Sequence, residues 1–236
     1  MHYEVLIVVA RYKEDITWLI PYASQSLIVN KGYRETNVSD SLTSFPNVTK
    51  EENIGRESHT YLHFIAKNYH CLPEVIIFTQ GKIHDHFSED VSTLFSRFIE
   101  EVNSYGASLP THIHFTSDLA HKSSWDPDWN VHTVEEVEGV TSTRFILEDC
   151  YLDNNKICFS EWFQVNIGRP YKYPFKLYRS AIFAVHKSQI LSRPLAFYQS
   201  LLRFCSHHID PAEGHFLERS WYYIFNEHCN TDPVEK

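Results

Sequence analysis

The chain has 236 residues, of which 43% are hydrophobic and 15% aromatic, and its formal net charge is −9 at pH 7. This composition supports a sizeable core and argues against intrinsic disorder. The length allows one large domain or two small ones, and one is favoured because α/β domains of this size are common. The acidic balance argues against a general nucleic-acid-binding protein. With only seven glycines, a glycine-rich phosphate-binding loop is not expected.

The cysteines and the N-terminal segment bear on the cellular compartment. The five cysteines include no C-x-x-C pair, and their odd number is typical of reduced thiols. No run approaches the ~18 apolar residues of a membrane span. The opening MHYEVLIVVA lacks both a basic segment and a cleavage site, so it is predicted to be a strand and not a signal peptide. We therefore expect a cytoplasmic protein with no transmembrane segment.

Strands and helices are predicted to alternate in the first half of the chain. Continuous apolar runs predict buried strands over Tyr3–Ala10, Ser26–Val29 and Val75–Phe78. A short helix is expected around Ile16–Ile20, and a longer one begins at the Asn53–Gly55 turn and ends at Asn68, ahead of Pro73. Residues 33–52 are polar and are predicted to be an irregular loop or insertion. This alternation favours a parallel sheet covered by helices.

The second half is less regular. An amphipathic helix is predicted over Ser88–Tyr105, followed by a short strand within residues 110–117 and a surface loop over 118–130. Residues 131–160 are compatible with helix or strand. The final elements are predicted to be a strand over Arg179–Val185, a helix over Gln189–Cys205 that Pro194 breaks, and a helix over Ala212–Phe225.

Three polar tips follow the predicted strands of the first half. They are Arg11–Asp15, Asn30–Gly32 and Thr79–Asp85. The carboxyl ends of parallel strands meet at one edge of a sheet, where ligands of open α/β folds bind. In the first tip, Tyr12 could stack on a base, and Glu14 or Asp15 could accept from a ribose hydroxyl or a uracil N–H. The alternative is a solvated loop of mixed charge.

The start of the helix after Asn53 has the features of an anion site. Helix N-termini present free N–H groups and partial positive charge, and the Arg56 guanidinium suits a diphosphate. The alternative is an ordinary capped start, with Asn53 as the cap and Glu57 in the first turn. That alternative leaves Arg56 unexplained, because a cation there opposes the helix dipole.

Two further groups of residues could carry chemistry. His84, Asp85 and His86 follow the Val75–Phe78 strand and could bind a divalent metal, with Asp85 as the obvious ligand, or they could form a polar loop. Glu218 lies within an otherwise apolar helix. Such a carboxylate could have a raised pKa and act as a general base, or it could pair with an arginine such as Arg219 or Arg179.

Four blocks of the sequence carry a family resemblance. They are VVARYKEDITWL (8–19), NIGRESHTYLHFIAKNYHCLPEVIIFTQG (53–81), IFAVHKSQILSRPLAFYQSLL (182–202) and LERSWYYIF (217–225). The blocks resemble an uncharacterised, glycosyltransferase-like domain-of-unknown-function family, and their order resembles that of GT-A glycosyltransferases. The resemblance implies a GT-A-like (Rossmann-like), mostly parallel sheet flanked by helices in a single domain over 1–236. Residues 1–117 would be its nucleotide-binding half and residues 118–236 its acceptor-binding half.

The resemblance also implies a donor, an acceptor and site residues. The donor would be a nucleotide-diphosphate sugar, UDP- or GDP-linked, and the acceptor a hydroxyl on a glycan. Glu218 would be the catalytic base. The expected donor-binding residues are Ala10, Arg11, Tyr12, Glu14, Asp15, Asn30, Lys31, Asn53, Gly55, Arg56, Gln80, Gly81 and Lys82.

The sequence departs from the GT-A pattern at the metal motif. FTQG stands where D-x-D is expected. A manganese or magnesium ion would then depend on Asp85 with His84, or Lys82 and Arg56 would neutralise the diphosphate without a metal. Two other readings stay open: a metal-dependent hydrolase or nuclease that uses Asp15 with the 84–86 segment, and a catalytically inactive GT-A-like binding module.

Overall fold

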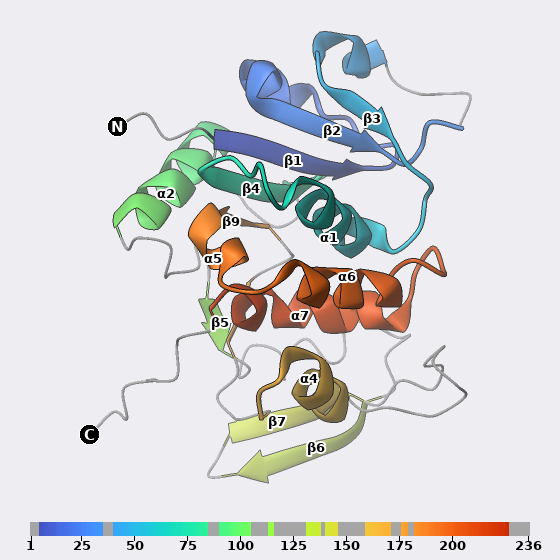
Figure 1. Cartoon of the computed structure of the whole chain (residues 1–236), viewed down its shortest axis with the longest axis vertical. Coiled ribbons are helices and arrows are strands. Elements are labelled where there is room, and N and C mark those ends of the chain that lie inside the picture. The colour runs from blue at the N-terminus through green and yellow to red at the C-terminus, as the bar shows by residue number, and fades with distance from the viewer. Residues whose placement is uncertain are drawn as a thin grey trace.

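A five-stranded sheet lies at the centre of the computed structural model, which describes residues 5–34, 40–84, 90–104, 113–115, 131–137, 140–145, 159–170, 176–178 and 182–226. The strand order is β3-β2-β1-β4-β9 (Figure 1). The strands are β1 (Val5–Arg11), β2 (Ser26–Asn30), β3 (Val48–Lys50), β4 (Val75–Gln80) and β9 (Phe183–His186). Four of them are parallel, and β9 pairs antiparallel with β4. The fold is thus a single α/β domain with a mostly parallel sheet, as expected.

Helices cover both faces of the sheet because the central strands are apolar on both sides. Val8 and Phe78 point into one hydrophobic cluster, and Val9 and Ile77 point into the other. The second cluster includes side chains of the 3-10 helix η1 (Thr17–Gln25) and of α2 (Val91–Ser104). The first cluster is covered by α1 (Arg56–Asn68), α4 (Phe159–Ile167), α5 (Lys187–Leu191), α6 (Leu195–Phe204) and α7 (Ala212–Phe225).

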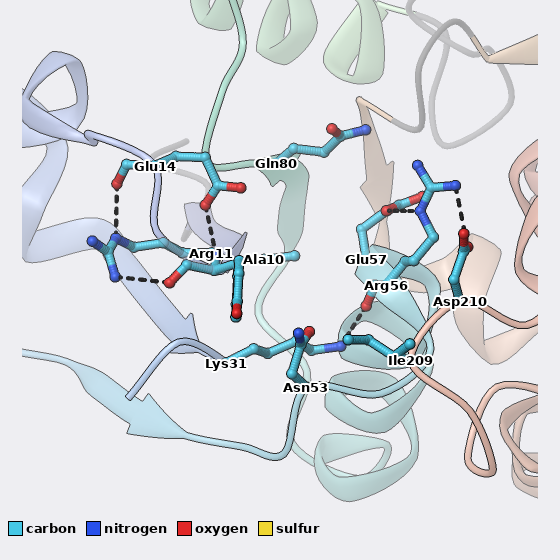
Figure 2. Close-up of a pocket in the computed structure, with 11 residues that line it drawn as sticks. Ala10, Arg11, Glu14, Lys31, Asn53, Arg56, Glu57, Gln80, Ile209 and Asp210 are labelled. Carbon is cyan, nitrogen blue, oxygen red and sulfur yellow. Dashed lines mark hydrogen bonds and ion pairs between the residues drawn. The ribbon is translucent and has the colours of Figure 1, made fainter. Parts of the chain in front are cut away.

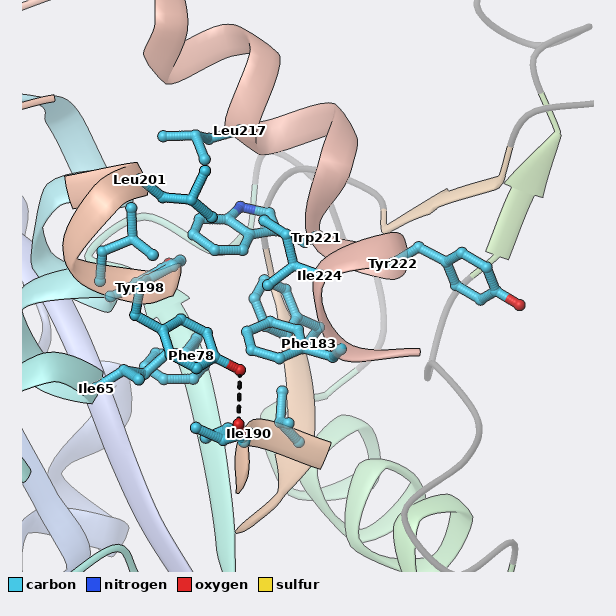
Figure 3. Close-up of a cluster of buried hydrophobic side chains, with 14 of the residues drawn as sticks. Ile65, Phe78, Phe183, Ile190, Tyr198, Leu201, Leu217, Trp221, Tyr222 and Ile224 are labelled. Atoms are coloured by element: carbon cyan, nitrogen blue, oxygen red, sulfur yellow. Dashed lines mark hydrogen bonds between the residues drawn. The ribbon is translucent and has the colours of Figure 1, made fainter. Parts of the chain in front are cut away.

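Aromatic packing in the first cluster fixes α1 and α7 to the same face of the sheet (Figure 3). The Tyr61 ring on α1 lies 4.7 Å from the Phe78 ring on β4, centroid to centroid. Trp221 on α7 lies 5.9 Å from Tyr61 and 5.7 Å from Phe183 on β9. A hydroxyl–carbonyl hydrogen bond of 2.8 Å joins Tyr198 to Ile190 within the same cluster. The segment that leads into α7 is thereby held near the start of α1.

Several predicted elements differ from the observed ones. Residues 33–52 were predicted to be irregular, but they contain the 3-10 helix η2 (Asp40–Ser44) and the edge strand β3. β3 is exposed throughout and has no apolar run, so its sequence carries no strand signal. The short helix expected at Ile16–Ile20 is a 3-10 helix that continues to Gln25 with Pro21 inside it.

The remaining described elements lie outside the central sheet. Two antiparallel pairs are present, β5 (Ile113–Phe115) with β8 (Lys176–Tyr178) and β6 (Val131–Val137) with β7 (Val140–Phe145). β5 confirms the strand predicted within residues 110–117, whereas the loop predicted at 118–130 lies outside the described residues. Among the helices that the structure describes, none combines the length and apolar character needed to cross a bilayer.

Candidate functional site

A pocket of about 360 Å³ opens at the carboxyl edge of the sheet (Figure 2). The tip of β1 lies between those of β2 and β4, because Arg11 is in register with Asn30 and Ala10 with Gln80. From β1 the chain adds β2 and β3 on one side of the sheet and then β4 on the other, so the strand order reverses between β1 and β4. Open α/β sheets usually bind ligands at such a switch point, beyond the carboxyl ends of the strands. The lining residues are Ala10, Arg11, Tyr12, Glu14, Lys31, Asn53, Arg56, Glu57, Gln80, Ile209 and Asp210.

Arg11 and Glu14 hold the loop after β1 in shape. The Glu14 carboxylate accepts from the backbone N–H groups of Tyr12 and Lys13 at 2.6 and 3.1 Å. The buried Arg11 guanidinium donates to the carbonyls of Glu14 and Tyr12 and to the Asn30 side chain. Burial lowers the pKa of Arg11. Its Nη2 is buried with no hydrogen-bond partner among the described residues.

Two glycines allow the strand tips to approach this loop. A Cβ on Gly32 would lie 1.9 Å from the Tyr12 carbonyl oxygen. A Cβ on Gly81 would lie 2.8 Å from the Glu14 carboxylate, and the Gly81 N–H donates to Ala10. Gly81 and the buried Asn30 therefore shape the pocket from behind its lining.

Lys31, which follows β2, is hydrogen-bonded to the turn that precedes α1. Its side chain is 5% exposed, and Nζ donates to the carbonyls of Ile54, at 2.6 Å, and Arg56. Burial lowers the Lys31 pKa to about 8, although Glu51 and Glu57 oppose that effect. Lys31 thus lines the pocket, and its buried ammonium holds the Ile54–Arg56 backbone in place.

The turn that Lys31 contacts has a left-handed backbone at Gly55 and Arg56. Gly55 is the N-cap of α1 with φ 62°, and Arg56 has φ 50°, which is uncommon for a residue with a Cβ. The alternative in which Asn53 caps the helix is wrong, because the cap is Gly55 and no side chain caps it; Asn53 lines the pocket instead. The Gly55 N–H donates to the His208 carbonyl at 2.8 Å, which brings the segment after α6 against the helix start.

Arg56 is surrounded by polar groups from both halves of the chain. Its Nη1 lies 3.5 Å from Asp210 Oδ1, and its Nε lies 3.8 Å from Glu57 Oε2. Nη1 is also 3.3 and 3.1 Å from the two ring nitrogens of His215, so it lies over the imidazole face. Burial alone would lower the pKa of Arg56, but Glu57, Glu218 and Asp210 raise it. The guanidinium is therefore charged at every physiological pH.

The pKa values of the two acids beside Arg56 are shifted in opposite directions. The hydrogen bond from His215, followed by the charge of Arg56, lowers the pKa of Asp210 despite partial burial. Glu57 is 8% exposed, and burial raises its pKa; the charge of Glu218 adds to this, whereas Arg56 opposes it. Sequence reasoning did not place Glu57 in the site, because an acid in the first turn of a helix is expected for capping alone.

Ile209 and Asp210 were also missed. They precede Pro211, the N-cap of α7, and lie more than 150 residues from Arg56 in the sequence. An Asp before a Pro-led helix start has no feature that distinguishes it from an ordinary turn residue. Only the packing of α7 against α1 reveals that these residues line the pocket.

Seven expected site residues do not line the pocket. Asp15 accepts hydrogen bonds from the N–H and hydroxyl of Thr17, and the His84 and Trp18 rings form a T-shaped pair with centroids 6.3 Å apart. Glu218 lies on α7, 4.0 Å from His215 Nδ1, with its side chain 27% exposed. The full set is Asp15, Asn30, Gly55, Gly81, Lys82, His84 and Glu218.

The predicted metal site is only partly covered by the structure. Asp85 and His86 lie outside the described residues. Within the described ranges, no cluster of three or more His, Cys, Asp or Glu side chains is arranged to hold a metal ion. Arg179, an alternative partner for Glu218, also lies outside them, and the guanidinium of Arg219 donates to the His215 carbonyl.

Comparison with known proteins identifies the family. Residues 6–236 match the family described as "Protein of unknown function (DUF3431)", so the chain belongs to that family. No curated protein matches the chain. The expected domain-of-unknown-function family is confirmed. Its description names no activity, so the glycosyltransferase resemblance stays a prediction.

Proposed function

We propose that this member of the DUF3431 family is a glycosyltransferase that moves a sugar from a UDP- or GDP-linked donor to a hydroxyl of a glycan acceptor. The observation that carries the proposal is the pocket at the β1/β4 switch point, where three parallel strand tips meet a helix start that bears an arginine. Its volume falls in the range of about 300–1,000 Å³ that is usual for small-molecule sites.

The arrangement suits the two parts of a nucleotide donor. Tyr12, at the tip of β1, offers a ring on which a base can stack, and Asn53 and Gln80 offer amides for sugar hydroxyls. Arg56 lines the same pocket at the start of α1. Its charge, with the helix N-terminus, would stabilise a diphosphate as the leaving bond breaks.

The described carboxylates do not form a divalent-metal site. Glu14 is bonded to backbone N–H groups, and Asp210 is engaged by Arg56 and His215. A manganese or magnesium ion would require Asp85, which stays a prediction. Arg56 is the cation that we assign to the diphosphate.

No described contact favours the hydrolase or nuclease alternative. Of its four residues, Asp15 and His84 lie outside the pocket lining, and the other two are not described. The inactive binding module differs from the transferase only in turnover. A sugar-transfer assay therefore distinguishes the two, because only the transferase would form product.

Thermal-shift titration with UDP, GDP and a panel of UDP- and GDP-sugars, with and without manganese, tests the proposal. A ligand that binds only the folded state raises the melting temperature with concentration, by mass action. We expect such a shift for one nucleotide class, and sugar transfer to a glycan acceptor with its best donor. The absence of any shift would contradict the proposal, and a shift without turnover would favour the inactive module.

A further inference from the structure

The backbone of Arg56 determines where its side chain points. Arg56 is the one residue other than glycine with a positive φ, 50°, in the part of the chain that the structure describes. Returning this φ to the helical value of about −63° would rotate its Cβ by roughly 110° about the N–Cα bond, relative to the preceding turn. The guanidinium would then leave its place beside Asp210 in the pocket wall. The left-handed conformation is therefore what places the Arg56 side chain in the pocket.

The Lys31 ammonium is bonded to the carbonyls of the two residues that flank Gly55. Nζ donates to Ile54, at 2.6 Å, and to Arg56. Figure 2 shows the Lys31 side chain reaching the Arg56 carbonyl while the Arg56 guanidinium points to Asp210. A strained backbone persists where the surrounding structure imposes it, and these two hydrogen bonds span the left-handed residues.

A second contact holds the turn without fixing Arg56. The Gly55 N–H donates to the His208 carbonyl at 2.8 Å, which restrains the glycine amide and leaves the φ of Arg56 free. Lys31 is thus the side chain, among the described residues, that is bonded to both ends of the left-handed turn.

We propose that Lys31 is a positioning residue for the donor's diphosphate, because its ammonium keeps Arg56 in the left-handed conformation that places the guanidinium in the pocket. This assignment rests on the proposed glycosyltransferase function. Two of the three ammonium N–H groups are used on the two carbonyls, and Lys31 is 5% exposed. Lys31 therefore acts through Arg56 and not on the ligand directly.

A double-mutant cycle tests the assignment. The single variants Lys31→Met and Arg56→Ala and the double variant are titrated with UDP or GDP, whichever binds wild type. We expect Lys31→Met to lower the affinity about tenfold in the wild-type background and to change it by less than about twofold when Arg56 is already alanine. The reason is that a residue that acts through Arg56 has nothing to position once the guanidinium is removed.

Two controls separate positioning from general damage. Lys31→Met should bind the parent nucleoside, uridine or guanosine, within about twofold of wild type, because the nucleoside carries no phosphate for Arg56. Lys187→Met is the matched lysine variant, since Lys187 pairs with Glu74 away from the pocket lining. It should leave the affinity for the nucleotide unchanged.

A pH series gives a second readout that needs no Lys31 variant. A neutral amine forms weaker hydrogen bonds than an ammonium, and burial lowers the pKa of Lys31 to about 8, against the opposing charges of Glu51, Glu57 and Cys205. The affinity of wild type for the nucleotide should fall at least ~threefold between pH 7 and 9, a fall that Arg56→Ala lacks. Ionisation of the nucleobase is common to both proteins and cancels in this comparison.

Each other result overturns a specific claim. Additive losses in the cycle, an affinity of Lys31→Met within twofold of wild type, or equal losses for nucleotide and nucleoside would each overturn the positioning role and leave the proposed function standing. If Lys31→Met does not fold, an equal pH dependence of wild type and Arg56→Ala overturns it. Absence of nucleotide binding by wild type overturns the proposed function, and the assignment with it.

Discussion

Arg56 combines three properties that are seldom found together in one residue. It has a positive φ, it stands at a helix start where a cation opposes the dipole, and it lines a pocket. Strained backbone and unfavourable charge persist where the surrounding structure enforces them, often at functional sites. Here Lys31 supplies that constraint, because its ammonium binds the carbonyls on both sides of Gly55.

Arg56→Ala is expected to weaken nucleotide diphosphate binding by about 1.5–3 kcal/mol, the scale of hydrogen bonds to charged groups. Isothermal titration of UDP or GDP, whichever binds wild type, measures the change. Arg203→Ala is the matched control, since Arg203 lies on α6 and contacts Ser200, outside the pocket lining. Equal affinities for both variants would remove Arg56 from the diphosphate site.

Lys31 gives stability a predictable pH dependence. Its pKa is about 8 in the folded state and 10.5 as the reference, so between these values the unfolded chain binds more protons. Stability contributed by this group therefore rises with pH across that window, by up to about 3 kcal/mol. Urea unfolding at pH 7 to 10 should show a steeper rise for wild type than for Lys31→Met. Parallel pH profiles for the two proteins would contradict the burial of a charged Lys31.

At the scale of elements, the contact between the α1 start and the segment after α6 assembles the pocket. A Cβ on Gly55 would lie 2.2 Å from the Cys205 carbonyl oxygen, which is backbone and cannot move aside alone. Gly55→Ala should therefore displace the segment that carries Ile209 and Asp210. The pocket would lose one wall along with stability.

Gly168→Ala is a control that measures the cost of the left-handed backbone conformation alone. Gly168 has φ +77° and open space around its Cβ position, whereas Gly55 has φ +62° and a clash. Both variants incur left-handed strain, but only Gly55→Ala adds overpacking, of about 1–3 kcal/mol. Chemical denaturation measures the difference, and nucleotide affinity should fall only in Gly55→Ala. Equal destabilisation would show that the Gly55 contact is not tight.

At the scale of the whole molecule, one aromatic cluster links the sheet to the C-terminal helices. Tyr61, Phe78, Phe183 and Trp221 come from α1, β4, β9 and α7 and contact one another in the first hydrophobic cluster. Through it, the segment before α7 reaches a pocket otherwise built from residues 10–80. Ile209 and Asp210, from the half of the chain expected to bind the acceptor, thus line the same pocket as residues of the expected nucleotide-binding half.

The sequence predicted the parts of the site that depend on local patterns. The apolar runs of β1, β2 and β4 are clear, and parallel strands bring their carboxyl ends to one edge, so Tyr12, Lys31 and Gln80 were foreseen. Asp210 was not, because its place depends on packing between distant segments, and Glu57 was not, because an acid in the first turn of a helix is expected for capping alone. Glu218 was expected in the site from its apolar helix, but periodicity alone does not show whether a side chain reaches a pocket.

A crystal structure with UDP or GDP, whichever raises the melting temperature, tests the central claim most directly. The claim is that the β1/β4 edge, with Arg56, binds a nucleoside diphosphate. We predict the nucleotide between the tips of these strands, with a diphosphate oxygen about 2.7–3.2 Å from the Arg56 guanidinium. A nucleotide bound elsewhere on the protein, with this pocket empty at saturating concentration, would contradict it.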